Sequence, residues 1–200
     1  MRSEIRLPDG YHEIDRIDLQ ENRRLGFRIG LAAVALAVLM IAVAAVFVPL
    51  TELFSPLVGV RLYIARLLAL VLGAAAYALL HELMEGYLLR RFGSVKETYH
   101  MSLLSPSVGS NAYFDKKRYL LIVLMPTVFW TVVLTAACCF VPRSWFWVAY
   151  LIQVFNLSGA VGDFYLCFRL SRLPLDILIQ DSGTQVRVYS RTEKLEKRPK

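Results

Sequence analysis

The amino-acid sequence predicts an all-α polytopic membrane protein, with four transmembrane helices and a short β-hairpin near the C-terminus. Of its 200 residues, 56% are hydrophobic and only 20% are charged, and the mean hydropathy is +0.49. The surface of a soluble domain usually needs about 25–35% charged residues. The chain instead holds four apolar stretches of at least the roughly 20 residues that cross a bilayer as a helix. These observations exclude an ordinary soluble enzyme and a disordered chain.

The first 28 residues form a polar arm that precedes the first membrane span. Within it, a few apolar residues are spaced like one weak helix face: Leu7, Tyr11, Ile14 and Ile17. We therefore expect residues 1–28 to form a cytoplasmic arm or a short interfacial helix. The first span covers residues 29–50, which contain no polar side chain.

Three further spans complete a transmembrane domain over residues 29–171. They cover about 62–89, 119–141 and 145–170. Three aromatic residues near the start of the last span predict an aromatic belt at one membrane interface: Trp145, Trp147 and Tyr150.

Residues 172–200 form a polar C-terminal region. Two short β-favouring runs, 176–180 and 185–189, flank the turn sequence Asp181-Ser-Gly-Thr184. This pattern predicts a hairpin. The mostly charged residues that follow, 190–200, predict a solvated tail.

The positions of the basic residues predict how the chain is oriented in the membrane. Twenty of its 23 Lys and Arg residues lie in the arm, in the 90–118 loop or from residue 169 onward. Of the remaining three, Arg61 and Arg66 lie in the first short connection and at the start of the second span, and Arg143 lies in the second short connection. Because basic loops stay on the cytoplasmic side, both termini and the long middle loop are predicted to be cytoplasmic, in the cytoplasmic membrane of a cell. The net charge of +7 thus reflects topology and a lipid bilayer partner, and it does not indicate nucleic acid.

Polar side chains inside the second span indicate a site, because charges within a bilayer are costly and usually have a partner or a function. The run His81-Glu-Leu-Met-Glu-Gly86 places His81 and Glu85 one turn apart on one helix face, with Glu82 beside them. Zinc proteases use this layout, with two ligands at positions i and i+4 and a Glu at i+1 that takes a proton from water. The usual second ligand is His, so this chain carries an HExxE variant of HExxH.

The fourth span carries a second polar group, in the run Asn156-Leu-Ser-Gly-Ala-Val-Gly-Asp163. Asn156, Gly159 and Asp163 share one helix face by their spacing of three and four residues. Because Gly159 has no side chain, we expect another helix to approach closely there.

The two polar groups are predicted to lie at the same depth in the membrane. Glu85 and His81 lie roughly 8 and 13 Å before Arg90, and Asp163 lies roughly 9 Å before Arg169. Taken singly, each residue has a simpler interpretation. His81 could be a packing histidine, the acids of the second span could reach solvent or nearby arginines, and Asp163 could pair with Arg169 or His81. Together, at one depth, they favour a metal site formed by His81, Glu85 and Asp163.

Four segments in this order resemble a known family: His81-Glu-Leu-Met-Glu-Gly86, Ala112-Tyr-Phe-Asp-Lys-Lys-Arg-Tyr119 with Pro126, Asn156–Asp163, and Asp181–Thr184. The chain resembles a bacterial membrane family described as putative zincin peptidases, which is similar in logic to site-2-type intramembrane metalloproteases. The resemblance implies a first ligand at His81, the catalytic acid/base at Glu82 and a third ligand at Asp163. The family's second ligand is a His at the position of Glu85.

With Glu at position 85, the sequence does not decide which metal ion binds or whether the site is active. Carboxylate oxygen binds zinc, so a His-Glu-Asp set is chemically possible. Two carboxylates shift the preference toward Mn or Fe. The enzyme could work with this altered site, Glu85 could be a changed residue, or the protein could be an inactive relative.

We therefore expect a zinc-type intramembrane metallopeptidase, a hydrolase that cleaves a membrane or juxtamembrane protein near the cytoplasmic face with Glu82 as general base. The alternatives are an inactive pseudoprotease or scaffold that binds membrane helices, and a small cation-binding transporter. Further expectations concern access of substrate to the site, to which Asn156 and Gly159 of the fourth span could contribute. The 92–118 loop could offer an edge for an extended substrate, His100 within it could be a spare ligand or gate, and Pro126 could loosen a helix for water and substrate. An ordinary connector, a solvated histidine and a tolerated kink are the alternatives to these three. The sequence does not indicate an oligomeric state.

Overall fold

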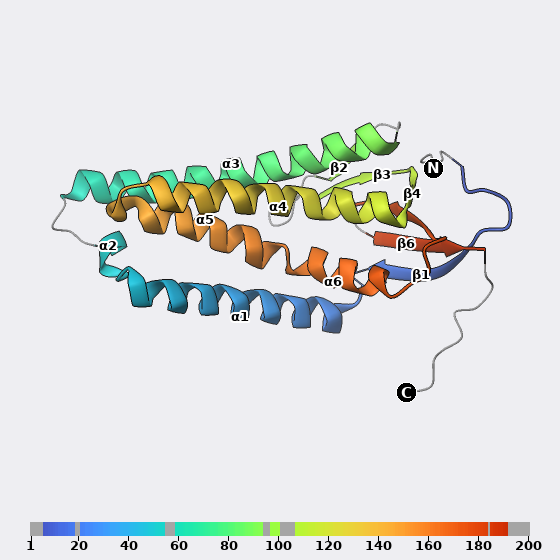
Figure 1. Ribbon diagram of the computed structural model, residues 1–200, viewed down its shortest axis with the longest axis horizontal. Coiled ribbons are helices and arrows are strands. Elements are labelled where there is room, and N and C mark those ends of the chain that lie inside the picture. The colour runs from blue at the N-terminus through green and yellow to red at the C-terminus, as the bar shows by residue number, and fades with distance from the viewer. Residues whose placement is uncertain are drawn as a thin grey trace. The chain divides into compact units, whose positions relative to one another are not determined.

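The computed structural model describes residues 6–18, 21–54, 59–93, 97–100, 107–183 and 185–191. In chain order, its elements are β1 (His12–Asp18), α1 (Arg23–Phe47), α2 (Thr51–Phe54), α3 (Val60–Gly93), β2 (Glu97–His100), β3 (Ser107–Ser110), β4 (Tyr113–Asp115), α4 (Lys116–Phe140), η2 (Arg143–Trp145), α5 (Phe146–Gly159), α6 (Val161–Ser171), β5 (Leu178–Asp181) and β6 (Gln185–Ser190) (Figure 1). The chain divides into two compact units. Unit 1 comprises residues 1–26, 82–124 and 165–200, and unit 2 comprises residues 27–81 and 125–164.

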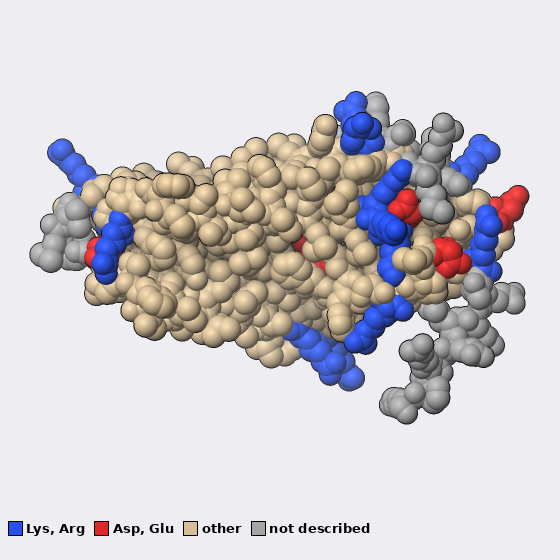
Figure 2. All heavy atoms as spheres, viewed as in Figure 1, with Lys and Arg blue, Asp and Glu red and all other residues tan. Residues whose placement is uncertain are grey.

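Four helical segments are long and apolar enough to cross a membrane, which confirms the predicted number of spans. They are Arg23–Phe47, Val60–Gly93, Lys116–Phe140 and Arg143–Ser171. Only 6% of the apolar window of α1 is buried inside the protein, so its hydrophobic side chains suit a lipid environment. On the face seen in Figure 2, uncharged side chains cover the long helices, and Lys and Arg gather toward the helix ends. The cytoplasmic location of the termini stays a prediction.

The fourth span is two helices rather than the single helix expected over 145–170. Helix α5 ends at Gly159, and α6 begins at Val161. Ala160 between them has φ −76° and ψ 2°, and its N–H still donates to Asn156 O at 3.2 Å. Glycine is a poor helix former, which explains why the break falls here.

The N-terminal arm contains a strand, so the expectation of an interfacial helix there is wrong. Strand β1 pairs antiparallel with β6, and the register shifts between Glu13 and Asp15. Such a bulge interrupts the alternation of faces along a strand. Ile14 and Ile17, three residues apart, can therefore both pack on the core of unit 1. Their helix-like spacing arises from this bulge.

The predicted C-terminal hairpin is present as β5 and β6, but it lies in the middle of a four-stranded antiparallel sheet. The strand order is β1-β6-β5-β4. The 92–118 loop contributes β4 to this sheet and also forms a separate hairpin of β2 and β3. The chain is therefore mostly helical with a small sheet region, and the all-α assignment was too narrow.

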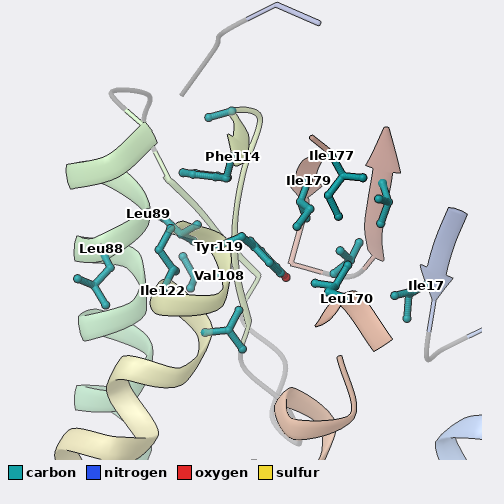
Figure 3. Packing of buried hydrophobic residues seen from close by; sticks show 14 residues of the cluster. Ile17, Leu88, Leu89, Val108, Phe114, Tyr119, Ile122, Leu170, Ile177 and Ile179 are labelled. Atoms are coloured by element: carbon teal, nitrogen blue, oxygen red, sulfur yellow. The ribbon is translucent and has the colours of Figure 1, made fainter. Parts of the chain in front are cut away.

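The core of unit 1 lies between this sheet and the ends of the long helices. Phe114, Tyr119, Leu89, Leu170 and Ile179 each have no exposed surface. Figure 3 shows these side chains approaching one another from α3, α4, α6 and the strands. Burial of large apolar side chains of this kind contributes about 1.5–3 kcal/mol each, so this core is the main stabilising feature of unit 1.

One buried lysine fastens the end of α6 in unit 1. Lys116 is 6% exposed, and its Nζ donates to the carbonyl oxygens of Ser171 at 3.0 Å and Leu173 at 2.6 Å. The last carbonyl groups of a helix lack partners within the helix, and a basic side chain can satisfy them.

In unit 2, two aromatic residues at the start of the fourth span make hydrogen bonds within the protein, and the aromatic belt at a membrane interface stays a prediction. Trp147 is 1% exposed, and its Nε1 donates to Pro49 O at 3.1 Å. Tyr150 donates to Met40 O at 3.0 Å. These bonds tie α5 to α1 and to the turn that follows α1.

The close helix approach expected at Gly159 occurs instead at Gly73 on α3. A Cβ built at Gly73 would lie 2.7 Å from Ile152 Cδ1 of α5. Around Gly159, apart from its chain neighbours and its own helix backbone, no atom of the described residues lies within 4 Å of such a Cβ. Gly73 thus provides the small-residue contact that lets the two helices of unit 2 pack.

Candidate metal centre

Helix α3 carries three of the predicted site residues. It is unbroken from Val60 to Gly93, and its stretch before His81 is rich in Ala and Leu, which are strong helix formers. The predicted helical spacing is therefore confirmed, with His81 and Glu85 one turn apart and Glu82 between them in sequence. His81 belongs to unit 2, whereas Glu82 and Glu85 belong to unit 1.

His81 is held by a tyrosine one turn earlier on the same helix. Tyr77 Oη lies 3.0 Å from His81 Nδ1, and the two rings meet edge to face with centroids 5.6 Å apart. Tyr77 is itself 8% exposed, and the rings of Trp130 and Phe155 pack against it edge to face. The imidazole is thus fixed by a hydrogen bond and by aromatic packing.

Asn156 on α5 is the centre of a buried polar network in unit 2. It has no exposed surface, and its Oδ1 accepts from the Tyr77 hydroxyl at 2.9 Å. Its Nδ2 donates to Thr131 Oγ1 at 2.9 Å and, at 3.4 Å each, to Thr127 O and Gln153 Oε1. A buried amide of this kind is costly unless its groups are hydrogen-bonded, and here both ends of the amide have partners.

Asn156 is predicted to lie at the substrate or on its access path. In the structure, its side chain is instead enclosed within this network. Its amide is enclosed by protein groups from α3, α4 and α5. The arrangement favours a role in orienting His81 through Tyr77. A direct role toward substrate stays a prediction.

Glu82, the predicted general base, has an unusual environment. Its Oε2 is buried and has no hydrogen-bond partner among the described residues. A buried carboxylate oxygen without a partner is strongly disfavoured, unless a proton, a water molecule or a cation satisfies it. The position of this oxygen is therefore consistent with a group that binds one of these three.

The predicted third ligand, Asp163, lies in the first turn of α6 and is half-buried, as is Glu85 on α3. Within the part of the chain that the structure describes, no group of three or more His, Cys, Asp or Glu side chains is close enough together to hold a metal ion. The ligand set of His81, Glu85 and Asp163 therefore stays a prediction.

The remaining predicted residues fall at separate places. Pro126 is buried within α4, next to Thr127 of the polar network. Gly159 is the last residue of α5. His100 lies in β2 opposite Ser107, and its side chain lies outside the described part of the protein.

Tyr77 and Thr131 are not among the site residues predicted from the sequence. A signal for Tyr77 exists, because it lies four residues before His81 and so occupies the same helix face. Thr131 gives no such signal, because its partner Asn156 is on another helix.

The chain thus has four helices that are long and apolar enough to span a membrane. One of these helices carries the HExxE motif, whose histidine is hydrogen-bonded to Tyr77. These features are typical of a membrane protein with a zincin-like motif. Residues 74–178, more than half of the chain, match the family described as putative zincin peptidase. The chain belongs to this family. The match includes the HExxE helix, the polar network and the Asn156–Asp163 run. No curated protein matches the chain, and no solved structure does.

Proposed function

We propose that the protein is an intramembrane metallopeptidase of the zincin type, in which Glu82 is the general base. Its membership in a family described as putative zincin peptidase supports a metallopeptidase. The single observation that carries the finer proposal is the anchoring of His81 by Tyr77 at 3.0 Å. Ligand histidines are characteristically held through their second ring nitrogen in this way.

The chemistry of the residues fits a divalent metal ion. His81 supplies an imidazole nitrogen, and Glu85 and Asp163 supply carboxylate oxygens, all of which bind zinc. Glu82 Oε2 is buried without a hydrogen-bond partner among the described residues, and a nearby cation would satisfy it. We take zinc as the resident ion, with Mn or Fe as alternatives because of the two carboxylates.

A bound zinc ion supplies a Lewis acid that polarises a water molecule and the scissile carbonyl group. Glu82 Oε2 then takes a proton from the attacking water and later gives it to the leaving amine. Tyr77 keeps the His81 ring in one orientation throughout, because its hydroxyl is itself held by Asn156.

The proposed substrate is a membrane or juxtamembrane protein cleaved near the cytoplasmic face of the cytoplasmic membrane. The four membrane-span-capable helices support this substrate class, because peptides in solution would not meet residues at membrane depth. A helical peptide bond is shielded by its own hydrogen bonds, so the substrate must unwind before cleavage.

A catalytically inactive relative that binds membrane helices is the second candidate. Glu85 stands where the resemblance predicts a His, and the described residues form no three-ligand group. Both observations favour this alternative over a fully assembled zinc site.

Metal content distinguishes the two candidates. The protein is purified in detergent without a polyhistidine tag, and its zinc, manganese and iron are measured by mass spectrometry. We expect about one ion per chain in the parent, and loss of that ion in His81→Ala and Asp163→Ala. Asp176→Ala is the matched control, because Asp176 is an exposed acid and is outside the membrane spans. A parent without metal, or ligand variants that retain it, would support the inactive relative.

A further inference from the structure

The polar network of unit 2 has a definite direction of proton donation. Thr131 Oγ1 donates to Thr127 O at 2.7 Å, so its only proton is engaged and its oxygen accepts from Asn156 Nδ2. Asn156 Nδ2 also lies 3.4 Å from Thr127 O, a carbonyl that can only accept. The amide of Asn156 is therefore oriented with Nδ2 toward α4 and Oδ1 toward Tyr77.

This orientation decides what the tyrosine hydroxyl can do. Asn156 Oδ1 is an acceptor on a residue with no exposed surface, and Tyr77 donates to it at 2.9 Å. Leaving a buried acceptor unsatisfied is costly, so the single hydroxyl proton of Tyr77 stays on this bond. The Tyr77 oxygen can then only accept from His81 Nδ1, which lies 3.0 Å away.

We propose that Asn156 and Tyr77 are positioning residues that hold His81 as its Nδ1–H tautomer, so that Nε2 keeps the lone pair that binds a metal ion. In a neutral imidazole, one nitrogen carries the proton and the other has the free lone pair. The buried network therefore selects the binding nitrogen before any ligand arrives. That Nε2 serves a metal ion rests on the proposed function, whereas the tautomer itself does not.

Because the tautomer of His81 depends on the direction of these hydrogen bonds, we expect Asn156→Leu to change it. Removal of the Oδ1 acceptor frees the Tyr77 proton, which then turns toward His81 Nδ1. The imidazole proton must move to Nε2, although no atom that contacts His81 has changed. Asn156→Asp keeps an acceptor oxygen for Tyr77 and should keep the original tautomer.

Nitrogen-15 NMR of the whole protein in detergent reads the tautomer directly, because protonated and unprotonated ring nitrogens have well-separated chemical shifts. The chain has three histidines, so histidine-selective labelling gives few signals, and those lost in His81→Gln belong to His81. The metal-free protein is measured at alkaline pH, where imidazole is neutral. Tyr77→Phe is compared with Tyr87→Phe, a tyrosine on the same helix that is 62% exposed.

We expect a protonated Nδ1 in the parent, in Asn156→Asp and in Tyr87→Phe, and a protonated Nε2 in Asn156→Leu and Tyr77→Phe. Zinc titration of the same samples should show the dissociation constant rising about 10- to 100-fold in the last two variants only. A parent with Nε2 protonated, or an unchanged tautomer in both Asn156→Leu and Tyr77→Phe, would overturn the inference. A parent with the expected tautomer that binds no zinc, manganese or iron would instead overturn the proposed function, and the hydrogen-bond assignment would stand.

Discussion

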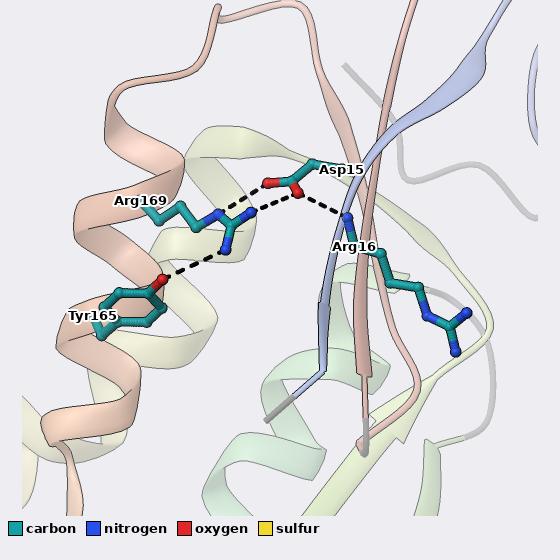
Figure 4. A network of polar contacts seen from close by, with 4 residues as sticks. All are labelled: Asp15, Arg16, Tyr165 and Arg169. Carbon is teal, nitrogen blue, oxygen red and sulfur yellow. Dashed lines mark hydrogen bonds and ion pairs between the residues drawn. The ribbon is translucent and has the colours of Figure 1, made fainter. Parts of the chain in front are cut away.

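Arg169 near the end of α6 forms a bidentate ion pair with Asp15 in β1, although the two residues are 154 positions apart in the sequence. Arg169 Nη2 donates to Asp15 Oδ1 at 2.6 Å, and Nε donates to Oδ2 at 3.0 Å (Figure 4). The Tyr165 hydroxyl accepts from Arg169 Nη1 at 3.4 Å, and Asp15 Oδ1 also accepts from the Arg16 backbone N–H at 2.9 Å. The sequence offered Asp163 as a partner for Arg169, but the structure pairs this arginine with the N-terminal strand. Within unit 1, the pair fastens β1 against α6.

We expect Asp15→Asn to lower the free energy of unfolding of unit 1 by about 1–2 kcal/mol, because one charge of a partly buried, bidentate pair is lost. Thermal unfolding in detergent measures this change, and hydrogen exchange of the β1 amides locates it. Glu52→Gln is the control. Glu52 meets Arg143 at 3.6 Å through a single contact, with both side chains well exposed, and should change stability by less than about 0.5 kcal/mol. Equal effects of the two substitutions would contradict a special role for the Asp15–Arg169 pair.

Glu82→Gln should abolish turnover while leaving metal content unchanged. The amide keeps the size of the side chain but cannot take a proton, so we expect kcat to fall by about 10²- to 10⁴-fold. Cleavage of a membrane-protein substrate library by the detergent-purified enzyme, together with metal analysis of the same sample, checks both parts. If Glu82→Gln cleaves as fast as the parent, Glu82 is not the base. If it loses the metal, Glu82 is itself a ligand.

Glu85→His should tighten zinc binding under the proposed ligand set. The substitution restores the HExxH pattern on α3, and imidazole replaces one of two anionic oxygen ligands with a nitrogen that zinc favours over manganese. Competition with a zinc chelator measures the change, and the manganese affinity of the same variant should not rise in parallel. An unchanged zinc affinity would mean that the side chain at position 85 is directed away from the metal.

The parts of this fold that could be predicted from sequence are those set by local pattern. Long apolar runs specify the membrane-span-capable helices, and the Gly-containing turn at 181–184 specifies the β5–β6 hairpin. By contrast, β1 pairs with β6, about 170 positions away in the sequence. A bulge near Ile14 also interrupts the alternation of apolar and polar residues along β1, so that the apolar residues have the spacing of a helix. No local pattern reveals such a pairing.

The same distinction applies to the candidate site. The spacing of His81, Glu82 and Glu85 follows from helix geometry and is confirmed. The partners of Asn156 depend on how α3, α4 and α5 are rotated against one another, and side-chain packing across the whole bundle sets these rotations. Asn156 could therefore be singled out as a buried polar residue, but its link to His81 through Tyr77 could not be foreseen.

The pH dependence of stability should carry a contribution from Asp181. This carboxyl is buried, which raises its pKa above the ordinary value near 3.9, and hydrogen bonds from the Tyr119 hydroxyl and the Gly183 N–H offset part of that rise. Because the folded state holds this proton more tightly than the unfolded state, the free energy of unfolding falls as the pH rises above about 4. The fall continues until the folded carboxyl has ionised, with a slope of at most about 1.4 kcal/mol per pH unit.

Asp181→Asn tests this contribution, because an amide keeps an acceptor for the Gly183 N–H and does not titrate. The difference in unfolding temperature between parent and variant, measured from pH 4 to pH 8, should favour the variant increasingly as the pH rises. Two parallel curves would show that Asp181 has an ordinary pKa in the folded protein.

Gly109→Ala should destabilise unit 1 by at least about 1–3 kcal/mol, the usual cost of overpacking. A Cβ built at Gly109 in β3 would lie 2.1 Å from the carbonyl carbon of Ser182 and 2.4 Å from Gly183 N, which are backbone atoms of the β5–β6 turn. Gly183 has a positive φ of 84°, so the turn itself has little freedom to move aside. Gly159→Ala is the matched control, because its new methyl group meets no described atom within 4 Å and its position at a helix end favours alanine. Thermal unfolding in detergent should therefore separate the two variants by several degrees, and equal unfolding temperatures would mean that β3 does not rest on this turn.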